Sequence, residues 1–258
     1  MTDIDRIERA MYATANRLGG GTLEWTDDWV QLTTPNAKTD YRNVVYRSVL
    51  SEDELDARVA AVIEQHRRLG VGFRWWVTPS TRPADTGTRL EAHGFEHIDD
   101  VEGMVADANE FPEPSRDDIE VVRIGLAELD EWVDTTGDGW DMPASGRARF
   151  RTEVETVLAE NSPSAHYFVA RRDGAPVGSC ALSILDGYGH FAGSVVIPEH
   201  RRCGVYREMI YERMRFLRSI GLRDVTNTCV KSTSAPICAK LGFRKVFDSQ
   251  IYRHAGGG

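Results

Sequence analysis

The most informative segment of the chain is Pro198-Glu199-His200-Arg201-Arg202-Cys203-Gly204-Val205-Tyr206-Arg207. An apolar run ending at Ile197 precedes it and apolar residues at helical spacing follow it, which predicts a strand, a short turn and a helix over residues 204–219. The first amides of a helix have no intrahelical partner and lie at the positive end of its dipole. Gly204 adds no side chain that would keep a diphosphate away from these amides. The stretch therefore predicts an anion-binding turn.

This turn resembles the signature of the GNAT superfamily of acyl-CoA-dependent N-acyltransferases, Arg/Gln-x-x-Gly-x-Gly/Ala. Arg201, Gly204 and Tyr206 occupy the three signature positions, although Tyr206 departs from the small residue usual at the last one. Residues 234–243 resemble the family's closing helix, which ends in Gly-Phe. The resemblance covers residues 119–254 and implies the α/β GNAT fold, a mixed and mostly antiparallel central sheet flanked by helices.

The resemblance also implies where a CoA cosubstrate binds. Its diphosphate would lie on the amides of residues 202–207, and its pantetheine along the strand that ends at Val195 and Val196. A strand separated from its neighbour there would offer unpaired amides to the pantetheine and a donor to the thioester oxygen. The cofactor-binding residues implied in this way are Val195, Val196, Arg201, Arg202, Cys203, Gly204, Val205, Tyr206 and Arg207.

The order of predicted elements occurs twice along the chain. A helix over 52–69, a strand over 73–77, a helix over 84–93 and a strand from Gly94 are matched downstream by the elements that follow residue 204. The first copy has three carboxylates at its helix start and no Arg-x-x-Gly. We therefore interpret the first copy as degenerate and expect it to bind no CoA; an unrelated small α/β domain is the alternative. The predicted division is a smaller GNAT-like N-terminal domain over 1–108, a linker over 109–118 and a GNAT acetyltransferase domain over 119–254.

Two residues are candidates for proton transfer. Attack by an amine requires that a proton leave it, and the departing thiolate can take one up. His190 is the candidate base. Cys238 is the candidate acid, because the resemblance places a tyrosine of many family members at its position. The alternatives are that His190 is a surface or hydrogen-bonded core histidine, that Cys238 only packs, and that water alone accepts the proton.

An acidic segment around a tryptophan is the candidate acceptor site. Carboxylates beside Trp140 would attract a cationic amine and the indole would contact its apolar part. We expect Asp138, Trp140 and Asp141 to bind this substrate, with a solvated acidic helix as the alternative reading. The whole acidic segment comprises Glu128, Asp130, Glu131, Asp134, Asp138 and Asp141.

Composition excludes several classes of partner. The 258 residues include 31 Lys and Arg against 40 Asp and Glu, a formal net charge of −9, so binding to nucleic acid lacks an electrostatic driving force. No apolar run approaches the roughly 18 residues of a membrane span, and the N-terminus lacks a signal-peptide pattern. We expect a cytoplasmic protein without a membrane partner. The four cysteines form no C-x-x-C pair, and we expect no metal.

Together these features predict an enzyme that transfers acetyl from acetyl-CoA to a primary amine of a small molecule. The transfer is expected to be a direct attack in a ternary complex, in a monomer or homodimer. A protein or peptide N-acetyltransferase is one alternative. A non-catalytic acyl-CoA-binding regulatory protein is another, because Cys238 replaces the tyrosine and no base is compelling. A different acyl-CoA reaction, such as decarboxylation, is a weaker third.

Overall fold

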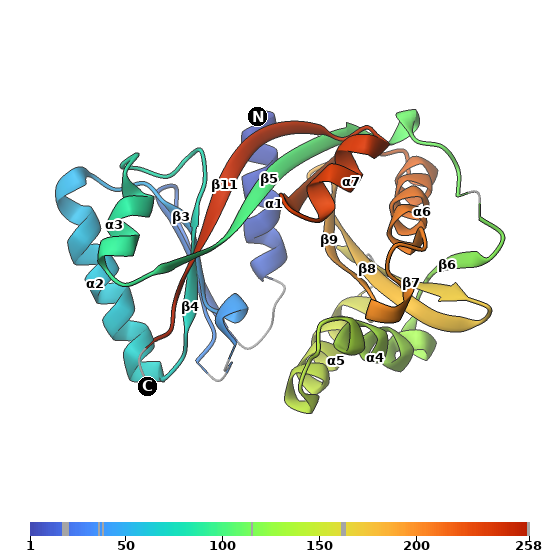
Figure 1. The fold of residues 1–258 in the computed structure, drawn as a ribbon, viewed down its shortest axis with the longest axis horizontal. Coiled ribbons are helices and arrows are strands. Elements are labelled where there is room, and N and C mark those ends of the chain that lie inside the picture. Colours follow the sequence, from blue (N-terminus) through green and yellow to red (C-terminus); the bar gives the residue numbers. More distant parts are fainter. Residues whose placement is uncertain (17–20, 36, 38, 115, 161–163, 257–258) are drawn as a thin grey trace. The chain divides into compact units, whose positions relative to one another are not determined.

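The chain forms two compact units in a computed structural model that describes residues 1–16, 21–35, 37, 39–114, 116–160 and 164–256. Unit 1 consists of Met1–Met104, Cys229–Pro236 and Lys245–Gly258. Unit 2 consists of Val105–Thr228 and Ile237–Arg244. Both units contain strands and helices (Figure 1).

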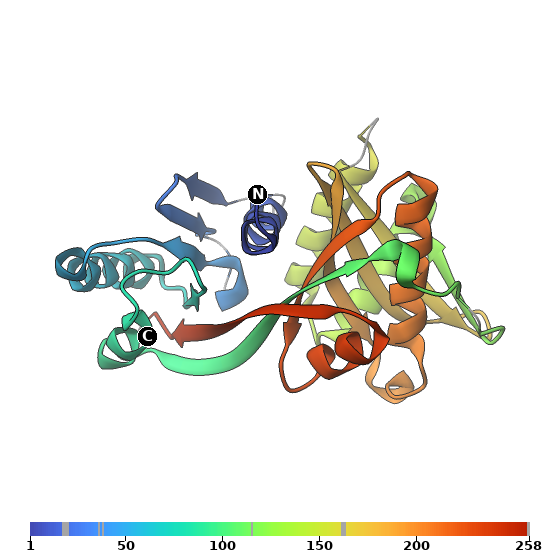
Figure 2. The same cartoon turned by 90° about the horizontal axis from the view of Figure 1, so that it is seen from above.

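Unit 2 is built on a mostly antiparallel sheet. Its strands pair antiparallel in the order β6 (Ile119–Arg123), β7 (Ala165–Arg172), β8 (Ala175–Leu185) and β9 (Tyr188–Val196). Strand β10 (Asp224–Val230) joins β9 in parallel. Helices α4 (Leu129–Gly139) and α5 (Ala144–Leu158) cover one face and α6 (Val205–Ser219) covers the other (Figures 1 and 2). This arrangement confirms the predicted mixed sheet flanked by helices.

Helix α6 forms where the sequence predicts it. It begins after Gly204 and ends just before Gly221, whose φ angles of +87° and +77° lie in the left-handed region that favours glycine. Its apolar side is buried against the sheet and consists of Val205, Met209, Ile210, Met214 and Leu217. The two glycines therefore bound a helix that is anchored by its apolar face.

Unit 1 has the same α/β character. The strands β1 (Thr22–Trp25), β2 (Trp29–Thr33) and β3 (Val44–Ser48) pair antiparallel, and β4 (Phe73–Val77) pairs with β3 in parallel. Helices α2 (Glu52–Leu69) and α3 (Thr86–Ala92) contribute to a core that includes Trp29, Val45, Leu55, Val59, Val62, Phe73, Trp75, Leu90, Phe95 and Tyr252.

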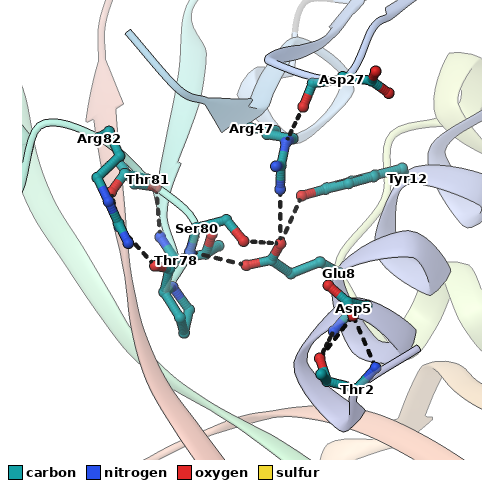
Figure 3. Close-up of polar contacts among 11 residues, drawn as sticks. Thr2, Asp5, Glu8, Tyr12, Asp27, Arg47, Thr78, Ser80, Thr81 and Arg82 are labelled. Atoms are coloured by element: carbon teal, nitrogen blue, oxygen red, sulfur yellow. Dashed lines mark hydrogen bonds and ion pairs between the residues drawn. The ribbon is translucent and has the colours of Figure 1, made fainter. Parts of the chain in front are cut away.

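A buried carboxylate fastens helix α1 (Asp3–Asn16) to unit 1 (Figure 3). Oε2 of Glu8 accepts hydrogen bonds from Ser80 Oγ at 2.6 Å, Arg47 Nη1 at 3.2 Å and the Tyr12 hydroxyl at 3.3 Å. Because the carboxylate is 2% exposed, its burial requires these donors. The contacts fix the segment that contains Ser80 against α1.

The repeated order of elements is present. The series α2, β4, α3, β5 (Glu96–Asp107) is matched by α6, β10, α7 (Ser234–Leu241), β11 (Arg244–His254). The compact units nevertheless do not follow the predicted ranges, because β11 pairs antiparallel with β4 of unit 1. Ile251 and Tyr252 of β11 are buried there. The final strand thus belongs to unit 1, whereas the predicted domain over 119–254 includes it.

The segment predicted as a linker is packed along α6. Nη1 of Arg218, near the end of α6, donates to the carbonyls of Ala108 at 2.6 Å and Phe111 at 3.1 Å, and Arg218 also pairs with Glu113. At the start of the same helix, Arg116 lies beside Gly204. Residues 109–118 are therefore part of unit 2; Ser115 lies outside the described residues.

Candidate active site

The predicted anion-binding turn connects β9 to α6. A short 3-10 turn, Pro198–His200, follows β9, and the backbone is left-handed at Arg202 (φ +63°) and at Gly204. Glu208 donates a helical hydrogen bond to the Gly204 carbonyl at 3.2 Å. The amides of residues 205–207 thus belong to the first turn, where a helix offers them no carbonyl. This is the arrangement that favours an anion.

The space over Gly204 suits a diphosphate. A Cβ on this glycine would lie 3.2 Å from Nη1 of Arg116 and 3.7 Å from Nη2 of Arg207, so any side chain would enter a space bordered by guanidinium groups. Amide donors, a helix dipole and cations act together on a phosphate. The residues present at this turn therefore fit the diphosphate of CoA.

Strand β9 separates from β10 next to this turn. The parallel pairing joins Gly189–Phe191 of β9 to residues 225–227 of β10, while β9 itself continues to Val196. A register shift in the β8–β9 pairing also falls here, and Gly193 has φ +54°. The end of β9, with Val195 and Val196, is the part of the strand that the sequence predicted for pantetheine.

The signature arginine is exposed and contacts two backbone carbonyls. Nε of Arg201 donates to the Val196 carbonyl at 3.1 Å, and its Nη2 contacts the Gly139 carbonyl at 3.5 Å. Gly139 itself lies so close to β9 that a Cβ there would be 2.3 Å from Val195 Cγ2. Arg201 therefore holds the turn against the ends of β9 and α4.

The other predicted turn residues differ in accessibility. Arg202 is exposed and Val205 is buried. Cys203 is partly exposed, and its thiol contacts the Arg201 carbonyl at 3.5 Å. Arg207 pairs with the fully buried carboxylate of Glu208 at 3.1 Å. The turn thus carries exposed, partly exposed and buried side chains.

The candidate acid Cys238 is buried near the point where β9 and β10 part. Its Sγ lies 3.5 Å from the Tyr206 hydroxyl and 3.6 Å from Nδ2 of Asn227. Asn227 is opposite Phe191, at the end of the parallel pairing. Tyr206, which occupies the departing signature position, thus brings its hydroxyl to the thiol of Cys238.

The candidate base His190 is also buried, on the opposite face of the sheet. Its Nδ1 is 2.8 Å from the Thr226 hydroxyl. His190 and Thr226 are paired neighbours, as are Phe191 and Asn227. Successive residues of a strand point to opposite faces, so His190 lies on the other side of the sheet from the Asn227–Cys238 contact.

The candidate acceptor residues lie at the end of α4. Trp140 is 41% exposed, and its Cη2 would be 3.5 Å from a Cβ on Gly193, so the indole lies over β9. Asp138 is paired with Arg147 at 2.7 Å. Asp141 is exposed next to Trp140. The structure thus brings Trp140 to the separated strand, while an arginine already balances the charge of Asp138.

In unit 1 the place equivalent to the end of β9 is filled by the chain. After β3 pairs with β4 at Val45 and Trp75, the segment 78–82 lies along the end of β3. Arg82 donates its amide to the Ser48 carbonyl at 2.9 Å and accepts from the Leu50 amide at 3.2 Å. These contacts use backbone groups that correspond to the open end of β9.

The helix start of unit 1 is occupied as well. Oε2 of Glu54 accepts from the Ser51 amide at 3.0 Å and from its hydroxyl at 2.7 Å. These two hydrogen bonds lower the pKa of Glu54, so the carboxylate stays ionised. A negative charge at this position disfavours a phosphate.

Sequence reasoning missed three residues near the site. The sequence places Arg116 in the predicted linker and singles out neither Thr226 nor Asn227. The signal was weak in each case, because the distances in sequence to Gly204, His190 and Cys238 are large. Packing, rather than a local pattern, brings these groups together.

The described residues contain neither a candidate metal site nor a candidate membrane-spanning helix. No group of three or more His, Cys, Asp or Glu side chains in the described part of the chain is arranged to hold a metal ion. Among the helices that the structure describes, none is long and apolar enough to cross a membrane.

Comparison with known proteins agrees with the resemblance noted in the sequence. Residues 128–243 match the model of a family described as Acetyltransferase (GNAT) family. A search of curated proteins found no match. Among solved structures, the GCN5-related N-acetyltransferase from Kribbella flavida has a TM-score of 0.73 and 16% identity, covering 98% of this chain and 96% of that chain.

Two further solved structures are similar. A GCN5-related N-acetyltransferase from Sphaerobacter thermophilus has a TM-score of 0.68 and 15% identity, covering 92% of this chain and 83% of its own. A tandem GNAT protein from the clavulanic acid biosynthesis pathway has a TM-score of 0.62 and 16% identity, covering 93% and 85%. The fold is therefore that of these GCN5-related N-acetyltransferases. Residues 128–243 are similar to the acetyltransferase (GNAT) family, and this match spans somewhat less than half of the chain.

Proposed function

We propose that this protein transfers the acetyl group of acetyl-CoA to a primary amine of a small molecule, by direct attack in a ternary complex. The observation that carries the proposal is the combination of the Gly204 turn with the separation of β9 from β10. The turn supplies amides and cations for the diphosphate, and the end of β9 supplies backbone groups for the pantetheine. The thioester of acetyl-CoA would then lie where β9 separates from β10.

Proton transfer is assigned to the two faces of the sheet. Amine attack forms a tetrahedral intermediate and thiolate departure collapses it, so the proton lost by the amine and the proton gained by the thiolate can pass through different residues. His190 is the proposed base and Cys238, supported by the Tyr206 hydroxyl, is the proposed acid. The proton lost by the amine and the one gained by the thiolate balance.

These roles have separate tests. His190→Gln removes the base but can still bond to Thr226, and Cys238→Ser keeps a small donor near Tyr206. A lower kcat with unchanged KM for acetyl-CoA, together with a changed pH profile, is expected for each variant. An unchanged kcat would remove that residue from the mechanism and leave water as the proton acceptor or donor.

The amine is proposed to bind at the exposed face of Trp140. The indole offers a cation–π surface, and Asp141 offers a carboxylate beside it. Asp138 attracts the amine less strongly than Asp141 does, because Arg147 pairs with Asp138. Trp140→Ala is expected to raise the acceptor KM while the acetyl-CoA KM stays unchanged. A wild-type acceptor KM in this variant would contradict the assignment.

Unit 1 is proposed to be a degenerate copy that binds no CoA. Segment 78–82 fills the end of β3, and Glu54 occupies the helix start. Calorimetry is expected to give one CoA site per chain. Two sites would contradict this proposal without affecting the function proposed for unit 2.

The enzymatic proposal is tested by thiol release from acetyl-CoA over a panel of amines. Small polyamines, amino sugars and amino acids are compared with peptides that carry free N-termini or lysines. Turnover with a small amine is expected. Turnover with peptides alone would favour a protein N-acetyltransferase. CoA binding without transfer to any amine would favour a regulatory acyl-CoA-binding protein, which the burial of Cys238 also allows.

A further inference from the structure

An arginine outside the signature turn extends over it. Arg116 precedes β6, in the segment that runs antiparallel to α6 from the Arg218 contacts to Gly204. Its Nη1 would be 3.2 Å, and its Cδ 3.6 Å, from a Cβ on Gly204. The guanidinium therefore borders the space above the turn from a different part of the chain.

The orientation of this guanidinium is fixed by a carboxylate. Nε of Arg116 donates to Oδ1 of Asp118 and Nη2 donates to Oδ2, both at 2.7 Å. This bidentate pair leaves Nη1 as the nitrogen next to Gly204. A planar guanidinium held on one edge can present its remaining N–H groups to an oxygen anion. The ion pair with Asp118 thus orients the guanidinium so that Nη1 can donate to a group above Gly204.

The surrounding charges leave the turn cationic. Asp118 is shared with Arg172, whose Nη2 lies 3.2 Å from Oδ2, so this trio has a net positive charge. Arg207 is balanced by Glu208, while Arg202 is exposed. Arg201, the signature cation, is directed toward the Val196 and Gly139 carbonyls instead. A phosphate over Gly204 would therefore meet Arg116 rather than Arg201.

We propose that Arg116 is a phosphate-binding residue of this site, which donates through Nη1 to the diphosphate of CoA above Gly204. The inference rests on the proposed function, because it assumes that CoA binds at this turn. It adds to that function a phosphate-binding side chain that lies outside the signature positions. It also gives the segment before β6 a role in holding the cosubstrate.

The test measures binding and not turnover. Calorimetry compares the affinity of CoA for the full-length wild-type chain and for Arg116→Ala, Arg116→Lys and Arg172→Ala. Arg172 is the matched control, because it pairs with the same carboxylate and its side chain has the same 34% exposure as that of Arg116. Thermal unfolding of each variant shows that it is folded.

Loss of a charge-assisted bond to phosphate predicts about tenfold weaker binding of CoA to Arg116→Ala. Arg116→Lys is expected to recover part of the affinity, since the charge stays but the bidentate pair is lost. Arg172→Ala is expected to bind within about twofold of wild type, because surface charges away from the contact contribute little. Equal affinity of wild type and Arg116→Ala, or equal losses in Arg116→Ala and Arg172→Ala, would overturn the proposal.

Dephospho-CoA, which keeps the diphosphate and lacks the 3′-phosphate, identifies the group that is bound. The same loss in Arg116→Ala with both ligands supports the diphosphate contact. A loss seen with CoA alone would overturn it in favour of the 3′-phosphate. If wild type itself binds neither ligand, the proposed function fails, which distinguishes that outcome from failure of Arg116 alone.

Discussion

Replacing Gly204 by aspartate tests the anion-binding turn most directly. The residue has φ +87°, and its missing Cβ would lie 3.2 Å from the Arg116 guanidinium. The carboxylate of the Gly204→Asp variant would lie at the position proposed for the diphosphate of CoA. Two like charges 4 Å apart repel by about 4 kcal/mol at an effective dielectric constant of about 20. Since about 1.4 kcal/mol is a factor of ten, Gly204→Asp is expected to weaken CoA binding more than about 100-fold.

Backbone strain has to be separated from this repulsion. A left-handed residue with a side chain costs about 1–2 kcal/mol. Gly221, just beyond the other end of α6, provides the control, because its φ is +77° and a Cβ there would meet nothing within 4 Å. Gly221→Ala is thus expected to lower Tm by about 2–4 °C per kcal/mol without changing CoA affinity. Calorimetry and thermal unfolding measure both quantities. If Gly204→Asp binds CoA as tightly as Gly221→Ala does, the turn is not the diphosphate site.

Three further outcomes follow from burial and packing. Cys203, at the turn, is partly exposed, whereas burial raises the pKa of Cys180 to about 11 and keeps that thiol protonated. A thiol reagent at pH 7.5 should therefore label Cys203 first, and CoA should slow this reaction. Mass spectrometry that finds Cys180 labelled first would contradict the prediction. Burial lowers the pKa of His66 below its usual 6.5, so the unfolded chain binds more protons as pH falls below about 6.5 and stability is lost there. His66→Phe should flatten this acid loss in urea unfolding at pH 5–7, and an unchanged slope would refute the assignment. Gly139→Ala places a methyl 2.3 Å from Val195, and overpacking of this kind costs about 1–3 kcal/mol; a wild-type Tm would show that α4 shifts freely.

The elements that local patterns specify were predicted well. Helix α2 has the predicted limits, since Ser51 and Glu54 bond at its start and Gly70 is left-handed at its end. The turn at Gly204 follows from equally local requirements. Such features depend on residues a few positions apart, which a single sequence displays.

Contacts between distant residues were not predictable in this way. The pairing of Asp138 with Arg147, which weakens its role as an acceptor ligand, depends on how α4 packs with α5. The approach of Arg116 to Gly204 depends on the path of a segment without periodic pattern. The place of β11 between β4 and β5 likewise depends on its pairing with residues far away in the sequence.

The pairing of β11 with β4 also has a consequence for synthesis of the protein. Five residues of the last strand, Gln250 to His254, complete the sheet of the unit that the first hundred residues begin. During translation the early half must therefore wait, with the position of Tyr252 in its core vacant, until the ribosome has made almost the whole polypeptide. A gene fragment that stops after β5 would encode a sheet that lacks the strand between β4 and β5, so the first half of the chain is not an exchangeable module.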